Sequence, residues 1–230
     1  MKIIGHRGAA GSELENTLAS IQAAIDMGVY AVEIDIRKTK DNQLVVCHDS
    51  TLTRVSDSSD KISDLTLKQL QKIPLHGGAI VPTLSEVLEL VGEKRIYIEV
   101  KQPGCAKLLI KNLAKFPNAV VHVVSFKHGE LEILRMLAPE LNLGALERTK
   151  LFDVIHLAKR INLNGVGLNY WILNPLTYYL IKRAGLDLYV YTVNNRFQAK
   201  FLSLLYPDIA ICTDYPERFI KRRGKAIDSA

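Results

Sequence analysis

Two pairs of charged side chains lie on segments that otherwise have the composition of buried strands. Glu33 and Asp35 are separated by one apolar residue, and the same is true of Glu99 and Lys101. Because alternate residues of a strand point to the same face, the members of each pair share a face and the apolar residue between them points the other way. If these apolar residues pack against outer helices, the charged pairs point inward, where charges persist only when they are paired or bind a metal.

Three carboxylates that meet inside a protein repel one another unless a cation lies between them. Glu33, Asp35 and Glu99 offer only oxygen atoms as ligands, which suits a hard divalent cation such as Mg²⁺ or Ca²⁺. Zinc is less well suited, because the three cysteines have no spacing typical of zinc ligands. The sequence therefore predicts one bound divalent cation, either Mg²⁺ or Ca²⁺.

Two histidines and two further cationic side chains are close to the same segments. His6 and Arg7 follow the first predicted strand, and His48 ends a short one. Beside a metal, one histidine can accept a proton from an attacking oxygen while the other donates a proton to a leaving alkoxide. Arg7 and Lys101 would bring positive charge to phosphoryl oxygens. Each residue alone has an ordinary structural or surface explanation, but together they are suited to cleavage of a phosphodiester.

Alternating strands and helices along the chain would position these side chains. Apolar periodicity predicts strands at residues 2–5, 31–37, 44–48, 95–101, 119–124, 141–146, 165–168, 188–193 and 209–213. It predicts helices at residues 17–27, 84–91, 106–115, 128–138, 152–160, 175–184, 196–205 and 216–221. Asn16 and Asp214 are candidate N-caps, Gly28 a candidate C-cap, and Thr83 with Glu86 a candidate capping box.

This alternation indicates a parallel sheet covered by helices. Eight rounds, with residues 44–48 as a partner of the second strand, predict a closed (β/α)8 TIM barrel, whose catalytic groups come from the C-terminal ends of the strands. An open doubly wound sheet is the alternative, but the first strand–helix junction lacks a Gly-x-Gly-x-x-Gly sequence. Residues 49–82 interrupt the alternation with a Ser- and Asp-rich stretch and one short predicted helix at 66–73, as a functional cover or an insertion would.

Composition describes an ordinary globular protein. Of the 230 residues, 48% are hydrophobic and 23% charged, and we expect one domain over residues 1–224 with a tail at 225–230. The formal charge of +6 fits either attraction to phosphate-bearing or anionic partners or a solubility surplus, to which the basic cluster at 221–225 contributes. No nucleic-acid recognition motif accompanies the basic residues.

The sequence has neither an apolar run of membrane-spanning length nor the apolar stretch of a secretory signal near Met1. Three widely spaced cysteines fit a reducing compartment. We therefore expect a cytoplasmic protein without a membrane anchor, and the sequence leaves its oligomeric state open.

Nine short blocks, in order from residue 6 to residue 216, resemble the glycerophosphodiester phosphodiesterases. The blocks are His6-Arg7-Gly8, Glu15-Asn16-Thr17, Glu33-Ile34-Asp35, His48-Asp49, Val81-Pro82-Thr83-Leu84, Glu99-Val100-Lys101, Ser125-Phe126, Tyr191-Thr192-Val193-Asn194 and Thr213-Asp214-Tyr215-Pro216.

The resemblance implies a TIM barrel with a small insertion after the second strand, and hydrolysis of a small glycerophosphodiester to an alcohol and sn-glycerol 3-phosphate with a divalent cation. It also implies roles for the matched residues: metal ligands Glu33, Asp35 and Glu99, acid–base pair His6 and His48, phosphate-binding Arg7 and Lys101, and a nearby polar support, Glu15.

Three positions depart from the family pattern. Leu14 replaces the usual proline, Tyr191 the usual tryptophan and Asn42 the usual glycine. None is a catalytic group, so the departures bear on the leaving-group preference and leave the reaction type intact. Lysophospholipase D activity and a non-catalytic barrel that binds phosphodiesters remain the alternatives.

Overall fold

The computed structural model describes residues 1–149 and 151–220. Its strands are β1 (Lys2–Gly5), β2 (Ala31–Lys38), β3 (Leu44–Val46), β4 (Arg95–Val100), β5 (Val120–Ser125), β6 (Asn142–Glu147), β7 (Gly165–Asn169), β8 (Asp187–Tyr191) and β9 (Ala210–Thr213). Its α-helices are α1 (Leu18–Met27), α2 (Leu67–Leu70), α3 (Leu84–Val91), α4 (Ala106–Leu113), α5 (His128–Leu137), α6 (Leu151–Ile161), α7 (Pro175–Arg183) and α8 (Arg196–Leu205). None of these helices is long and apolar enough to cross a membrane.

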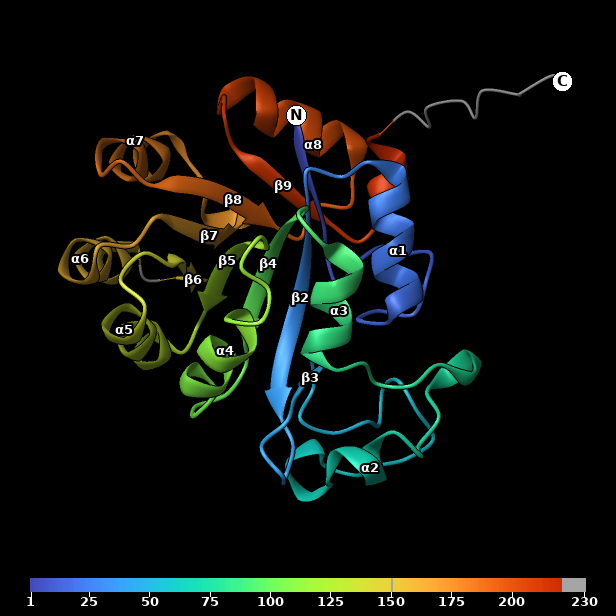
Figure 1. The fold of residues 1–230 in the computed structure, drawn as a ribbon. Helices are drawn as coiled ribbons and strands as arrows, with labels where there is room; N and C mark the ends of the chain where they lie inside the picture. Colours follow the sequence, from blue (N-terminus) through green and yellow to red (C-terminus); the bar gives the residue numbers. More distant parts are fainter. Residues whose placement is uncertain (150, 221–230) are drawn as a thin grey trace, which may run out of the picture.

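The strands form a closed barrel. They are ordered β1-β9-β8-β7-β6-β5-β4-β2-β3, and a further pairing of β1 with β2 closes the sheet. Every pairing is parallel except that of β3, which lies antiparallel to the end of β2. The helices between successive strands lie around the outside (Figure 1). This confirms the predicted (β/α)8 barrel, with β3 as a partner of the second strand, and excludes the open sheet.

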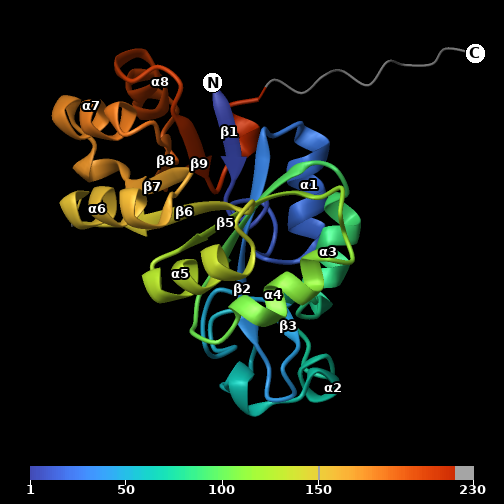
Figure 2. The same cartoon turned by 60° about the vertical axis from the view of Figure 1, so that its left-hand side comes forward.

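Two apolar layers fix the direction of the charged side chains. Ile34, Ile36 and Val100 are buried between the strands and the outer helices, whose ring is visible in Figures 1 and 2. Other buried side chains, among them Tyr97 and Tyr189, fill the barrel interior. Because a strand alternates its faces, the charged neighbours of the first group point into the barrel, as the sequence predicts.

The segment between β3 and α3 has a small core of its own. Leu52, Val55, Ile62 and Leu70 are fully or almost fully buried there. Helix α2 occupies only four residues of the predicted helix 66–73, and the rest of the segment contains short 3₁₀ turns. The segment lies beside β3 at the end of β2 marked by its arrowhead (Figure 1), so a stretch poor in regular structure is nevertheless anchored next to the site.

The observed caps correct two predictions. Thr17, rather than Asn16, is the N-cap of α1, and its hydroxyl accepts a hydrogen bond from the backbone N–H of Ser20. Asp214 does not cap the last helix: only a 3₁₀ turn forms at Pro216–Arg218, without a side-chain cap, and the predicted helix end at residue 221 lies outside the described residues, as does the basic cluster that follows. Both polar side chains are used in the site instead.

The other predicted caps are confirmed. Gly28 ends α1 with a left-handed φ of 78°, and Thr83 and Glu86 form the capping box of α3. Asn42, where the family pattern has glycine, has a φ of 59°, which asparagine tolerates better than most residues. The departure from the pattern therefore keeps the same backbone turn.

The loop after β4 depends on a buried acid. Glu130 is 4% exposed, and its carboxylate accepts hydrogen bonds of 2.7, 3.0 and 2.9 Å from the backbone N–H groups of Gly104, Cys105 and Ala106. Replacing Glu130 with alanine would leave three donors unpaired, so we expect Glu130→Ala to lower the free energy of unfolding by about 2–4 kcal/mol in urea denaturation. Glu89→Ala, at an exposed position of α3, is the control and should cost less than about 0.5 kcal/mol. Equal losses in the two variants would contradict this role for Glu130.

Candidate active site

Three acids converge on the neighbouring strands β2 and β4. Glu33, Asp35 and Glu99 are 4%, 0% and 9% exposed, and each offers a carboxylate oxygen within 4.8 Å of those of the other two. Asp35 and Glu99 lie opposite each other in the register of the two parallel strands. The structure thus brings together the three acids that the sequence singles out as metal ligands.

The negative charge of each acid affects the ionisation of the others. Burial and the neighbouring Asp35 raise the pKa of Glu33 to about 8, and the same two causes raise the pKa of Glu99. Burial alone would raise the pKa of Asp35 as well, but Lys101 and Arg7 outweigh it and lower that pKa to about 2. The protein alone therefore does not stabilise three negative charges at this place.

The donor set fits a hard divalent cation. All three acids supply oxygen atoms, and Oδ1 of Asp35 is buried without a hydrogen bond from any described residue. Its cationic neighbour, Lys101 Nζ, lies 3.4 Å away, so a bound cation would satisfy this oxygen more fully.

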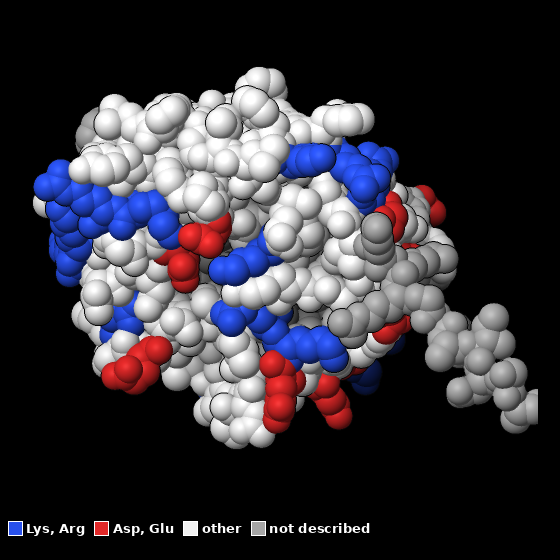
Figure 3. All heavy atoms as spheres, turned by 90° about the horizontal axis from the view of Figure 1, so that it is seen from above, with Lys and Arg blue, Asp and Glu red and all other residues white. Residues whose placement is uncertain are grey.

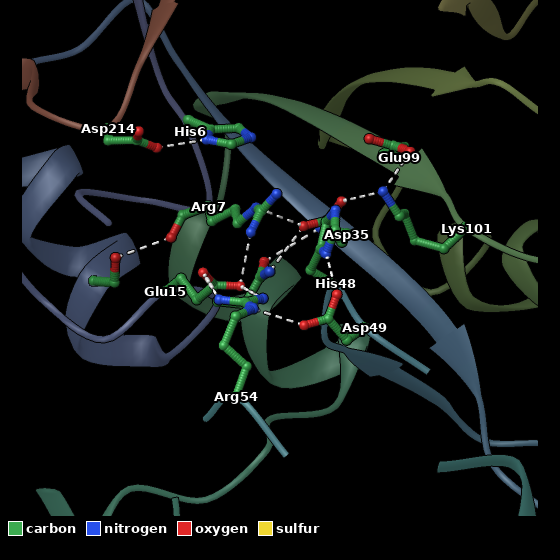
Figure 4. Close-up of polar contacts among 12 residues, drawn as sticks. His6, Arg7, Glu15, Asp35, His48, Asp49, Arg54, Glu99, Lys101 and Asp214 are labelled. Carbon is green, nitrogen blue, oxygen red and sulfur yellow. Dashed lines mark hydrogen bonds and ion pairs between the residues drawn. The ribbon is translucent and has the colours of Figure 1, made fainter. Parts of the chain in front are cut away.

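Lys101 and Arg7 partly balance the acids. The Lys101 Nζ lies 2.8 Å from Oε1 of Glu99 and 3.4 Å from Oδ1 of Asp35. The Arg7 Nε lies 3.2 Å from Oδ2 of Asp35, and the Arg7 backbone N–H donates to Glu33 over 3.0 Å. Figure 4 shows both cationic side chains directed at the carboxylates. They are therefore placed to contact an anion that lies over the acids.

Glu15 and Arg54 hold the guanidinium of Arg7 in place. Glu15 accepts a 2.9 Å hydrogen bond from Arg7, and it also accepts one of 2.7 Å from Arg54. Burial would raise the pKa of Glu15, but Arg54 and Arg7 outweigh it and lower the pKa. Arg54 also donates to Asp49 over 2.7 Å, so the segment after β3 is tied to the first strand's loop (Figure 4).

His6 is oriented by a chain of polar groups. Its Nδ1 lies 2.6 Å from Oδ1 of Asp214, and Asn194 donates to the other oxygen of Asp214 over 2.7 Å. Since an ionised carboxylate only accepts, Nδ1 carries the proton and Nε2 faces the acids, 4.0 Å from Glu33. Burial lowers the pKa of His6, but Asp214 and Glu33 outweigh it and raise the pKa above its ordinary value.

His48 has an equivalent partner. Its Nδ1 lies 2.6 Å from Oδ1 of Asp49, which again leaves Nε2 for the site. Here burial prevails, and together with Arg7 and Lys101 it lowers the pKa of His48, although Asp35 and Asp49 act in the opposite direction. Both predicted histidines therefore lie at the acids, each with an aspartate behind it (Figure 4).

Several polar residues of the site were missing from the sequence-based prediction. Asn16 donates to Asp35 over 2.9 Å and accepts from the Asp35 backbone, and the Arg37 side chain donates to the backbone carbonyl of His48 over 2.8 Å. The resemblance contains the signal for Asn16 and for Asp49, Asn194 and Asp214, since all four stand in its blocks. Arg37 and Arg54 stand outside the blocks, and their roles depend on three-dimensional contacts.

The turn at Gly8 serves packing. Gly8 has a φ of 88°, and a Cβ there would lie 2.5 Å from the backbone carbon of Ser20 on α1. The Ser20 hydroxyl donates to the Arg7 carbonyl over 2.9 Å, which holds the turn against the helix. The glycine-rich turn thus allows close approach of α1.

A cavity of about 30 Å³ opens beside the acids. His6, Glu33 and Glu99 line it together with Phe126 and Tyr191. The two aromatic rings meet edge to face with 6.1 Å between their centroids. The lining therefore combines charged groups with aromatic rings that can contact an apolar part of a ligand.

A slightly larger cavity, of about 40 Å³, lies at the opposite end of the barrel. It is lined by residues of strand N-termini, including Lys2, Asp187 and the stacked rings of Tyr97 and His122. The acids and histidines described above are at the other end, where the active sites of such barrels lie. Chemistry, rather than cavity size, thus locates the site.

The sequence model of the glycerophosphoryl diester phosphodiesterase family matches residues 6–218, which include all of the residues of the site. The chain belongs to this family. A glycerophosphodiester phosphodiesterase of Caldanaerobacter subterraneus subsp. tengcongensis is 31% identical over 240 residues, which cover 96% of this chain and 98% of that protein.

Of two further relatives, one has a lower sequence identity and the other matches only about half of this chain. The structure of an Oleispira antarctica phosphodiesterase in complex with the product sn-glycerol-3-phosphate matches with a TM-score of 0.89 and 24% identity, over 95% of this chain and 94% of that one. This similarity supports the fold. A lysophospholipase D of Mus musculus is 36% identical over 125 residues, which cover 49% of this chain and 39% of that protein.

The role of Asp214 as the partner of His6 can be tested in this protein without a turnover assay. Asp214→Asn removes a negative charge and the acceptor of the Nδ1 proton, so we expect the pKa of His6 to fall in an NMR titration of the imidazole signals of the metal-free protein. Asp49→Asn is the matched control, which should lower the pKa of His48 and leave that of His6 unchanged. An unaltered His6 pKa in Asp214→Asn would contradict the orientation described.

Proposed function

We propose that the protein hydrolyses glycerophosphodiesters to an alcohol and sn-glycerol 3-phosphate, with one divalent cation, Mg²⁺ or Ca²⁺, held by Glu33, Asp35 and Glu99. The observation that carries the proposal is the convergence of these buried acids beside two histidines, at the end of the barrel where catalytic groups lie. Family membership supports the same reaction class.

The side chains of the site divide the work of phosphodiester cleavage. Arg7 and Lys101 bind the phosphoryl oxygens and balance the negative charge that grows on them. His6 and His48, each with Nε2 available, accept the proton of the attacking hydroxyl and donate one to the leaving alkoxide. The bound cation supplies further positive charge for the phosphate and lowers the pKa of the attacking hydroxyl.

Two nucleophiles are compatible with these groups. One is water, and the other is the 2-hydroxyl of the substrate's own glycerol, which would form a cyclic phosphate that water then opens. Either route needs one proton acceptor and one proton donor on opposite sides of the phosphorus. The two histidines provide them in both cases.

Lysophospholipase D activity is the second candidate. The aromatic rings of Phe126 and Tyr191 in the lining of the cavity favour it, because they offer contact to a less polar leaving group or chain. Turnover of glycerophosphocholine compared with its lysolipid separates the two substrates. A non-catalytic barrel would bind both without turning either over.

We also propose that the enzyme works in the cytoplasm. Cys47, Cys105 and Cys212 are buried and unpaired, which fits a compartment that keeps thiols reduced.

Removal of the cation should abolish turnover. In excess EDTA we expect no release of glycerol 3-phosphate from glycerophosphocholine, and added Mg²⁺ or Ca²⁺ should restore it, because the three acids then regain their counter-charge. Asp35→Asn serves as the comparison, since it should be inactive with either ion. Full activity in EDTA would refute the role of the metal.

Loss of either histidine should slow the reaction. We expect His6→Ala and His48→Ala each to lower kcat by about 10²-fold or more, measured as glycerol 3-phosphate release under saturating metal. His156→Ala, at an exposed position of α6, is the control and should match the parent. A His48→Ala enzyme as fast as the parent would remove His48 from the mechanism.

A further inference from the structure

The outer faces of α7 and α8 carry large apolar side chains in contact with solvent. On α8, Phe197, Phe201 and Leu204 are 84%, 60% and 74% exposed, and their spacing of four and three residues places them on one face. On α7, Leu176 and Tyr179 are 62% and 55% exposed. We call these five residues the α7–α8 face.

The two helices are neighbours in the outer ring of the barrel. The Tyr178 hydroxyl of α7 donates a 2.7 Å hydrogen bond to the carbonyl of Pro207, just after α8, and the Tyr178 ring lies 5.2 Å from that of Tyr206. Figures 1 and 2 show α7 and α8 as neighbours in both views. Exposed apolar side chains gathered on neighbouring helices mark an interaction site more often than scattered single residues do.

The charged residues on α7 and α8 are all basic. Lys182, Arg183, Arg196 and Lys200 are exposed on the two helices, whereas the acids nearest to them in the sequence are Asp187 and Asp208, neither of which lies on α7 or α8. Asp187 opens β8, at the end of the barrel away from the acids of the site. Figure 3, a view from above Figure 1, shows a broad area without charged atoms, bordered mostly by Lys and Arg atoms and at one edge by Asp or Glu atoms.

From this combination we propose that the α7–α8 face binds the surface of an anionic lipid bilayer. Phenylalanine and leucine side chains enter the boundary between headgroups and acyl chains, while lysine and arginine stay at the level of the anionic headgroups. Arg196 and Phe197 begin α8 directly after the loop that follows β8, at the catalytic end of the barrel. Phe197 therefore lies near the catalytic end of the face, and the proposal does not depend on the identity of the substrate.

The same charges disfavour a second copy of the chain as the partner. A two-fold symmetric contact places identical surfaces against each other. The basic residues of one copy would then lie against the equally basic face of the other, whereas an anionic bilayer supplies the opposite charge.

Vesicle co-sedimentation tests the proposal. The full-length protein should sediment with vesicles of phosphatidylcholine and phosphatidylglycerol, and much less with phosphatidylcholine alone, because the basic residues need anionic lipid. Phe201→Ser/Leu204→Ser should weaken the partition by about tenfold or more. Lys182→Glu/Lys200→Glu should do the same through charge.

Two control substitutions lie on other helices of the barrel. Met136→Ser on α5, where Met136 is 74% exposed, and Lys107→Glu on α4 should bind vesicles like the parent. All four variants should keep the parent's turnover of water-soluble glycerophosphocholine, which separates this proposal from the proposed reaction. Absent vesicle binding, equal binding by all variants, or a dimer in light scattering that Phe201→Ser dissociates would overturn it.

Discussion

Repulsion among three buried carboxylates is the interaction on which the rest of the site depends. The parallel register of β2 and β4 places Asp35 opposite Glu99, and the strand period adds Glu33 on the same inner face. Burial raises the pKa of two of these acids, while Lys101 and Arg7 keep that of Asp35 low. Burying these like charges together costs folding free energy, which indicates that the acids serve to bind a ligand.

The loops around the acids add a second layer that fixes orientation. Asp214 and Asp49 each hold one histidine by Nδ1, so both rings present Nε2 to the same space. Glu15 and Arg54 restrain the guanidinium of Arg7 and connect the segment after β3 to the first loop. Orientation of this kind matters because proton transfer and charge stabilisation both fall steeply with small misplacements.

Most of the barrel and its principal charged groups were predictable from the sequence, for identifiable reasons. Period-two patterns around Ile34 and Val100 reveal which charges face inward, and strand–helix alternation reveals the parallel sheet. A local sequence pattern gives the wrong prediction where a polar side chain that could cap a helix instead bonds to a residue of a distant element. Asn16 and Asp214 look like helix caps, yet both bond to residues of other elements. Arg54 lies in a stretch of little regular structure, and its contacts depend on how that stretch packs.

The most direct test of the account is the position of a bound cation. Crystals grown with Mn²⁺, which shares the oxygen preference of Mg²⁺, should show one anomalous difference peak at about 2.0–2.6 Å from a carboxylate oxygen of each of Glu33, Asp35 and Glu99. The same peak should be absent from crystals of Asp35→Asn. A peak elsewhere on the protein, or one that contacts fewer than all three acids, would contradict the account.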